Sequence, residues 1–105
     1  MCVYEKYIDP RNPVVSVQIG NVLVSNVLID LGASINFMTK QTMDQLWLSH
    51  LRPTPIVLEL VDRSKIKPEG VTDDVIIALN SWEYPTDFIV LQPKNLVGGH
   101  PLILG

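Results

Sequence analysis

The most regular feature near the start of the chain is an alternation of apolar and polar residues. Residues 15–19 (VSVQI) alternate, Gly20 and Asn21 interrupt the pattern, and residues 22–29 (VLVSNVLI) form a second β-rich run. Two such runs joined by two turn-forming residues are typical of a β-hairpin. The sequence therefore predicts a hairpin over residues 15–29 that turns at Gly20 and Asn21.

A helical spacing of apolar residues comes next. Met43 lies three residues before Leu46 and four before Trp47, which places all three on one face of a helix. The hydroxyl of Thr39 is a suitable N-cap, because it can accept a hydrogen bond from a backbone N–H of the first turn. Since Pro53 cannot continue a helix, we expect one short helix between Thr39 and Pro53.

The second half of the chain returns to β patterns. Residues 56–66 (IVLELVDRSKI) alternate up to a polar tip and back, which predicts a second hairpin. Residues 70–93 predict two longer strands joined at Asn80 and Ser81, and the chain closes on the apolar run 101–105 (PLILG). With six or seven strands and one short helix, the fold class is all-β.

The domain organisation is simple. A chain of 105 residues is the size of one domain, and 47% hydrophobic against 18% charged residues is a globular composition. Residues 1–13 contain Pro10 and Pro13 and show no strand pattern, so we expect an irregular arm before a domain of residues 14–105.

Charge and composition exclude several classes of function. The net charge is −3 and the few Lys and Arg residues are scattered, which argues against binding to nucleic acid. No run approaches the roughly 20 apolar residues of a membrane span. Cys2, His50 and His100 lack the spacing of a zinc site, so we expect no metal and no cofactor. The start of the chain has no apolar segment typical of a signal peptide, which favours an intracellular, cytoplasmic location.

Asp30 is the most unusual acid in the chain. It ends the apolar run in "VLIDLGASINFM", residues 27–38, where a charged carboxylate is costly to bury without a partner. Either another group neutralises it or the chain turns there and exposes it. An ordinary turn acid that caps the end of the strand is the simpler interpretation.

The stretch "VLIDLGAS" resembles the Asp-Thr/Ser-Gly-Ala motif of retroviral-type aspartic proteases, the retropepsins. The closing "PLILG" is similar to the apolar-apolar-Gly element of the same family, and the order of the predicted elements between the two motifs also matches. The resemblance covers nearly the whole chain and is strongest to the protease region of plant gypsy-type LTR retrotransposon polyproteins. It implies a retropepsin-like closed barrel, the acid-protease fold. It also implies an aspartic endopeptidase that cleaves a Gag-Pol polyprotein in the cytoplasm or in virus-like particles.

The chemistry of the motif requires two carboxylates. One acts as a base on a shared water while the other, protonated, donates to the carbonyl oxygen of the substrate. Because the chain carries one such motif, the second Asp30 would come from a second copy in a two-fold homodimer. Asp62, Asp73 and Asp74 are the other acids that we considered, and we expect them to be solvated charges at hairpin or strand edges.

The resemblance assigns roles to the residues around Asp30. Gly32 permits a sharp turn beside the paired acids, Ala33 allows a peptide backbone to approach closely, and Ser34 stands where the family binds the substrate main chain. The tip of the second hairpin would be the flap that closes over an extended polypeptide substrate. The residues of this tip are Asp62, Arg63 and Ser64.

Two features of the sequence differ from the family pattern. Leu31 replaces the Thr or Ser whose hydroxyl bonds across the dimer axis, a net loss of about 0.5–1.5 kcal/mol for each hydrogen bond. The family also continues past the position of Gly105 into a short helix that helps to build the dimer interface. Both differences favour an alternative, a catalytically inactive or domesticated module for dimerisation or peptide binding. A small β-barrel binding domain is a third possibility.

The remaining residues of interest have simpler interpretations. We expect Trp47 and Trp82 to be aromatic residues of the core or its rim. His50 would interact with the C-terminal end of the helix, and His100 would be a loop residue. Cys2 has no assigned role.

Overall fold

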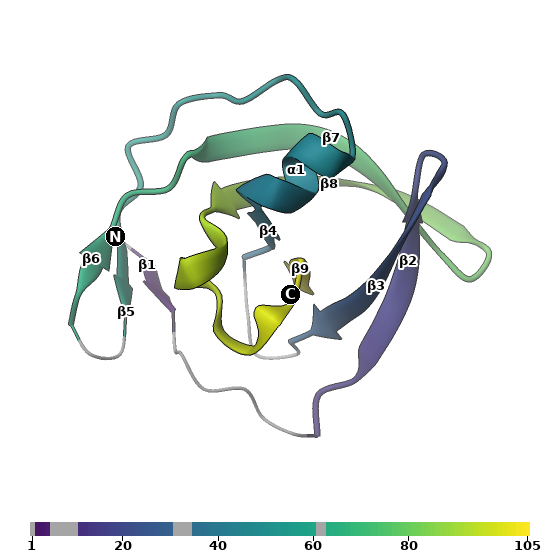
Figure 1. Ribbon diagram of the computed structural model, residues 1–105, viewed down its shortest axis with the longest axis horizontal. Helices are drawn as coiled ribbons and strands as arrows, with labels where there is room; N and C mark the ends of the chain where they lie inside the picture. Colours follow the sequence, from purple (N-terminus) through teal and green to yellow (C-terminus); the bar gives the residue numbers. More distant parts are fainter. Residues whose placement is uncertain (1, 5–10, 31–34, 61–62) are drawn as a thin grey trace.

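The computed structural model describes residues 2–4, 11–30, 35–60 and 63–105 of the chain. Its main feature is a closed barrel of six strands in the order β2-β3-β9-β4-β8-β7 (Figure 1). These strands are β2 (Val14–Ile19), β3 (Val22–Ile29), β4 (Phe37–Thr39), β7 (Gly70–Leu79), β8 (Trp82–Leu91) and β9 (Leu102–Leu104). The all-β class and the closed barrel predicted from the sequence are confirmed.

A second, three-stranded sheet lies beside the barrel, at the left of Figure 1. It consists of β1 (Cys2–Tyr4), β5 (Leu58–Leu60) and β6 (Lys65–Ile66), with β5 in the middle. β5 and β6 form the predicted second hairpin, and β1 runs parallel to β5. The sequence pattern did not predict β1, because three residues are too few to show an alternation. The rest of the N-terminal arm up to residue 10 lies outside the described residues.

The predicted hairpins of the barrel are present. β2 and β3 pair in antiparallel register around Gly20 and Asn21, and Gly20 has the positive φ of 59° that this turn requires. β7 and β8 pair in the same way around Asn80, which has a φ of 57°. Asparagine tolerates this left-handed conformation better than most residues, which explains its place at the turn.

The short helix α1 (Lys40–Gln45) begins as predicted. Thr39 is its N-cap, and the hydroxyl of Thr39 accepts a hydrogen bond of 3.1 Å from the N–H of Thr42. Met43 is buried, whereas Trp47, which we expected on the same face, is 90% exposed. Trp47 therefore lies outside the core.

The end of α1 explains the position of Trp47. The N–H of Leu48 bonds to the carbonyl of Met43 and the N–H of Trp47 bonds to the carbonyl of Asp44, while Trp47 has a φ of +59°. These are the two bonds of a Schellman motif, in which the residue after the C-cap takes the left-handed conformation. The left-handed turn redirects the chain, so Trp47 leaves the helical face and Leu48 packs against the core cluster to which Met43 belongs.

Two hydrophobic clusters hold the fold together, and they use alternate residues of the same strands. The first cluster receives buried residues from all six barrel strands and therefore fills the barrel: Val17, Val24, Met38, Ile77, Val90 and Leu102. The second lies on the opposite face and receives buried residues from five of these strands: Leu28, Phe37, Val71, Ile89 and Ile103. Leu58 of β5 is fully buried in this second cluster, which attaches the small sheet to the outside of the barrel. Burial of one such side chain stabilises the fold by about 1.5–3 kcal/mol.

Gly70, the first residue of β7, is a position where only glycine fits. It has a φ of +151°, and a Cβ built on it would lie 2.6 Å from the carbonyl oxygen of Arg52. Arg52 and the next residue, Val71, exchange two backbone hydrogen bonds of 2.8 Å, which holds the two segments close together.

We therefore expect Gly70→Ala to lower the free energy of unfolding by roughly 2–4 kcal/mol, through overpacking and backbone strain together. Chemical denaturation of both variants would measure the difference. Gly20→Ala is the matched control, because Gly20 also has a positive φ but a Cβ there meets no heavy atom within 4 Å. The free energy of unfolding of Gly20→Ala should fall by roughly 1–2 kcal/mol, because only the left-handed backbone is strained. Equal losses in the two variants would contradict the close contact at Gly70.

Candidate active site

Asp30 lies directly after β3, at one end of the barrel, and is half-buried. Its backbone N–H donates a hydrogen bond of 2.8 Å to the carbonyl of Leu104 in β9. β3 and β9 pair in parallel, with Leu28 opposite Ile103 and Ile29 opposite Leu104. The segments "VLID" and "PLILG", which stand far apart in the sequence, are therefore neighbours, and their pairing fixes the backbone of Asp30.

The loop that follows Asp30 is predicted to complete the site. The predicted active-site loop residues Leu31, Gly32, Ala33 and Ser34 lie outside the described residues. Ile35, which precedes Asn36 and β4, is partly buried against the second hydrophobic cluster.

Asn36 is a residue of this region that sequence reasoning missed. Its Oδ1 accepts a hydrogen bond of 2.9 Å from the N–H of Gly105, and its Nδ2 donates to the carbonyl of Asp87 over 3.4 Å. Its own carbonyl accepts from the N–H of Ile89 at 2.9 Å. The sequence shows only one amide side chain between Ile35 and the apolar strand β4. It could not reveal the role of Asn36, because its partners Asp87 and Gly105 are far away in the sequence.

The predicted flap is the hairpin of β5 and β6. Arg63 and Ser64 lie at its tip and are exposed, and Arg63 has a positive φ of 68°. Asp62, the third predicted flap residue, lies outside the described residues. β5 has neighbours on both sides, β6 and β1, so a peptide that extended this sheet would pair with one of those outer strands.

The other acids considered from the sequence have different surroundings. Asp73 accepts two hydrogen bonds from the guanidinium of Arg52, from Nε at 2.9 Å and from Nη2 at 3.0 Å. These hydrogen bonds, together with the charge of Arg52, hold the pKa of the Asp73 carboxyl below its usual range. Asp74 is exposed where the register of β7 and β8 shifts, and its backbone N–H donates to the carboxylate of Asp87. Both acids thus belong to the β7–β8 surface.

His100 has a structural role that the sequence did not reveal. It follows the short 3-10 turns η1 (Pro93–Asn95) and η2 (Val97–Gly99) and is only 8% exposed. Its Nδ1 lies 2.8 Å from the carbonyl oxygen of Asn26, so it connects the segment before β9 to the middle of β3. His50 is exposed beyond the end of α1.

No metal site is apparent in the part of the chain that the structure describes. Within those residues, no three or more His, Cys, Asp or Glu side chains lie together as metal ligands would. The described residues also include no helix long and apolar enough to cross a membrane.

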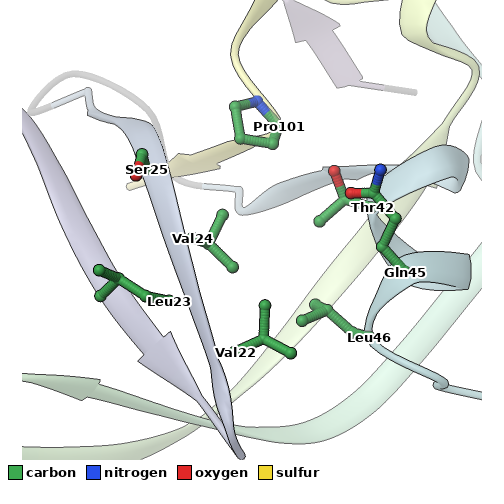
Figure 2. Close-up of a pocket in the computed structure, with 8 residues that line it drawn as sticks. All are labelled: Val22, Leu23, Val24, Ser25, Thr42, Gln45, Leu46 and Pro101. Carbon is green, nitrogen blue, oxygen red and sulfur yellow. The ribbon is translucent and has the colours of Figure 1, made fainter.

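One pocket lies between β3 and α1, with a volume of about 200 Å³ (Figure 2). Side chains from β3, from α1 and its C-cap, and from the segment before β9 line it. They are Val22, Leu23, Val24, Ser25, Thr42, Gln45, Leu46 and Pro101. Of the predicted site residues that the structure describes, Asp30, Arg63 and Ser64, none lines this pocket.

No family model matches the chain, and no curated protein matches its sequence. Among solved structures, the chain is similar to the retroviral protease-like domain of Ddi1 from Leishmania major. That match has a TM-score of 0.63 and 21% sequence identity, and it covers 94% of this chain and 71% of the other.

The chain has a retropepsin-like fold. At 21% identity the similarity concerns the fold, and function is a separate question because one fold can host different activities. In this retropepsin-like barrel, Asp30 lies where β3 ends beside β9.

The ion pair of Arg52 and Asp73 gives a prediction about pH. Arg52→Gln should raise the pKa of Asp73 toward the ordinary value of about 3.9, because it removes the charge and the paired donors. A depressed folded-state pKa stabilises the fold above the unfolded pKa, and this contribution disappears as the pH falls through the folded pKa. The parent should therefore exceed Arg52→Gln in stability at neutral pH, by a margin that shrinks in acid.

A carboxyl NMR titration of Asp73 and unfolding curves between pH 2 and pH 7 would measure both effects. Arg52→Lys is the matched control, because lysine keeps the charge but cannot bind the carboxylate with two parallel hydrogen bonds. In Arg52→Lys, the pKa of Asp73 should lie between its value in the parent and its value in Arg52→Gln. An Asp73 pKa that is the same in all three proteins would contradict the role of Arg52.

Proposed function

We propose that the chain is one subunit of a retropepsin-type aspartic endopeptidase in which Asp30 of two copies forms the catalytic pair. The observation that carries the proposal is the position of Asp30 in a retropepsin-like barrel, held by the hydrogen bond of its N–H to Leu104. The Asp-Leu-Gly-Ala sequence from residue 30 to residue 33 adds the chemical argument.

The proposed reaction is hydrolysis of a peptide bond by an activated water. Two carboxylates about 3 Å apart cannot both ionise readily, so the pair holds one proton over a range of pH. The ionised Asp30 removes a proton from the water, whose oxygen bonds to the carbonyl carbon, while the protonated Asp30 of the other subunit donates its proton to the carbonyl oxygen. The C–N bond then breaks as the first Asp30 gives its proton to the leaving nitrogen and the second Asp30 takes a proton back from a hydroxyl of the intermediate, which restores the starting pair. This division of roles requires no metal and no cofactor.

The proposed active unit is a two-fold dimer. A two-fold axis brings the same surface of both copies together, so each Asp30 meets its own counterpart. The hairpins of β5 and β6 from the two copies would then cover one extended peptide, with Arg63 and Ser64 at each tip. Ile35, which is partly buried next to the predicted loop, would offer an apolar wall for a substrate side chain, whereas Ile89, the other residue considered for this role, is buried in the second hydrophobic cluster.

The proposed substrate is the polyprotein from which the domain itself derives. The sequence resemblance to plant gypsy-type LTR retrotransposon proteases supports this proposal, and it implies a Gag-Pol polyprotein as the natural substrate. An intracellular site of action, in the cytoplasm or in virus-like particles, follows from the same resemblance.

Asp30→Asn tests the chemistry. The amide cannot act as the base, so kcat/KM for a peptide substrate should fall by more than about 10³-fold while the fold stays intact. A peptide-cleavage assay with circular dichroism and thermal unfolding would measure both. Asp74→Asn makes the same change at an exposed acid of β7 and should retain cleavage. Cleavage by Asp30→Asn, together with a parent that pepstatin-type inhibitors do not affect, would show that the mechanism is wrong.

A second candidate function is a module that dimerises or binds peptides without cleaving them. Leu31 favours it, because leucine has no hydroxyl to bond across the dimer axis. Two leucines that meet at the axis would instead hold the subunits together by apolar contact. The two functions differ in whether a dimer, once formed, hydrolyses peptides.

Sedimentation over a concentration series tests the dimer. We expect a mass that rises from 11.8 kDa toward twice that value, with specific activity rising in parallel. Leu31→Lys places two like charges at the proposed axis and should shift the protein to the monomer. Leu23→Lys, the same change at a 62% exposed position of β3, should not. Cleavage by a protein that stays monomeric would rule out the shared pair, whereas a dimer without cleavage would support the second function.

A further inference from the structure

One peptide group, between Leu104 and Gly105, is bonded to both ends of the predicted catalytic loop. Its carbonyl accepts the hydrogen bond of 2.8 Å from the N–H of Asp30. Its N–H donates the hydrogen bond of 2.9 Å to Oδ1 of Asn36. Asp30 stands directly before the predicted loop residues 31–34, and Asn36 stands shortly after them. The end of β9 therefore holds the chain where it enters the loop and where it leaves it.

The side-chain amide of Asn36 continues this connection to β8. Its Nδ2 donates to the carbonyl of Asp87 over 3.4 Å, a long contact, so the bond of 2.9 Å to Gly105 is the stronger of the two. The two partners also fix the orientation of the amide. The backbone N–H of Gly105 can only donate, and the backbone carbonyl of Asp87 can only accept. If Oδ1 and Nδ2 of Asn36 were exchanged, Nδ2 would face the N–H of Gly105 and Oδ1 would face the carbonyl oxygen of Asp87.

The amides of this series point in one direction. The N–H of Asp30 donates to the Leu104–Gly105 peptide, this peptide donates to the amide of Asn36, and Asn36 donates to Asp87. Hydrogen bonds that run through successive amides polarise and strengthen one another. Loss of the Asn36 amide would therefore weaken the hydrogen bond from the N–H of Asp30 to the carbonyl of Leu104, although the amide does not touch that N–H.

We propose that Asn36 is a positioning residue for Asp30 and acts through the Leu104–Gly105 peptide group. Asn36 fixes the peptide from one side, and the peptide fixes the backbone of Asp30 from the other. The consequence for catalysis rests on the proposed function. The connection from Asn36 through the peptide group to the backbone of Asp30 does not rest on that function. It can therefore be tested even if the protein cleaves no peptide.

Amide hydrogen exchange by NMR tests the connection in the full chain. In Asn36→Leu, which removes both hydrogen bonds of the amide at similar volume, the N–H groups of Asp30 and Gly105 should exchange about tenfold faster. The N–H of Ile29 is an internal reference, because it bonds to Pro13 at 2.9 Å instead of to β9. The exchange rate of Asp30 relative to Ile29 should therefore rise about tenfold.

His100→Leu is the matched control, because it removes the other side-chain bond that attaches the β9 region, the one to Asn26. It should lower the melting temperature without raising the Asp30/Ile29 exchange ratio. If both variants raised the ratio equally, general loosening of β9 would explain the result and the proposal for Asn36 would be overturned.

Asn36→Asp provides a second variant with a pH signature. A protonated aspartic acid can still accept from the N–H of Gly105 and donate to the backbone carbonyl of Asp87. The ionised form has no donor for Asp87, but it is a stronger, charged acceptor for the N–H of Gly105. Because the connection to Asp30 runs through Gly105, the Asp30/Ile29 exchange ratio should be close to that of the parent below about pH 4, the ordinary pKa region of Asp, and no higher than that of the parent above it. A ratio above pH 4 as high as that of Asn36→Leu would overturn the role of the acceptor oxygen.

Peptide cleavage then separates the inference from the proposed function. With enzyme well above its dimer dissociation constant, kcat of Asn36→Leu should fall about tenfold and KM should change less than twofold. If the parent cleaves nothing but the exchange ratio rises, the connection stands and the proposed function fails. If the ratio does not rise, the inference fails whatever the activity. A raised ratio with unchanged kcat would overturn the positioning of Asp30 for catalysis.

Discussion

The parallel pairing of β3 and β9 is the interaction on which the rest of the structure depends. It joins the first hairpin of the barrel to the last strand, and the backbone hydrogen bond from Asp30 to Leu104 continues it by one residue. Parallel strands need a long connection, which here includes α1, the β5–β6 hairpin and the β7–β8 hairpin. The candidate site therefore joins residues from opposite ends of the barrel sequence, Asp30 and Leu104.

Because side chains alternate between the two faces of a strand, one set of short strands contributes residues to both hydrophobic clusters. In β9, Leu102 faces the interior of the barrel and Ile103 faces the second cluster, and both are fully buried. A strand buried on both faces has no polar side and so shows no alternating pattern. The same property makes the strand a rigid support for Asp30, since any shift would disturb both clusters.

The sequence predicted the parts of the fold that depend on neighbouring residues. The turn at Gly20, the N-cap at Thr39 and the β5–β6 hairpin all follow from local patterns. Trp47 was misplaced, because a left-handed turn ended the helix although no glycine marked it. β4 was missed because three residues buried on both faces carry no periodicity. Of the candidate site, Asp30 was evident in the sequence, whereas Asn36 and the bond of His100 to Asn26 were not.

The sequence by itself determined an all-β domain with one short helix and an acid at the end of an apolar strand. Local propensity and alternation carry that information, since both act over a few residues. Only the tertiary structure decided that the acid lies beside the last strand and that one peptide group bonds both to Asp30 and to Asn36. It also decided that β1 occupies one side of β5. These contacts join residues far apart in the chain, so the closure of the barrel selects them and no local pattern specifies them.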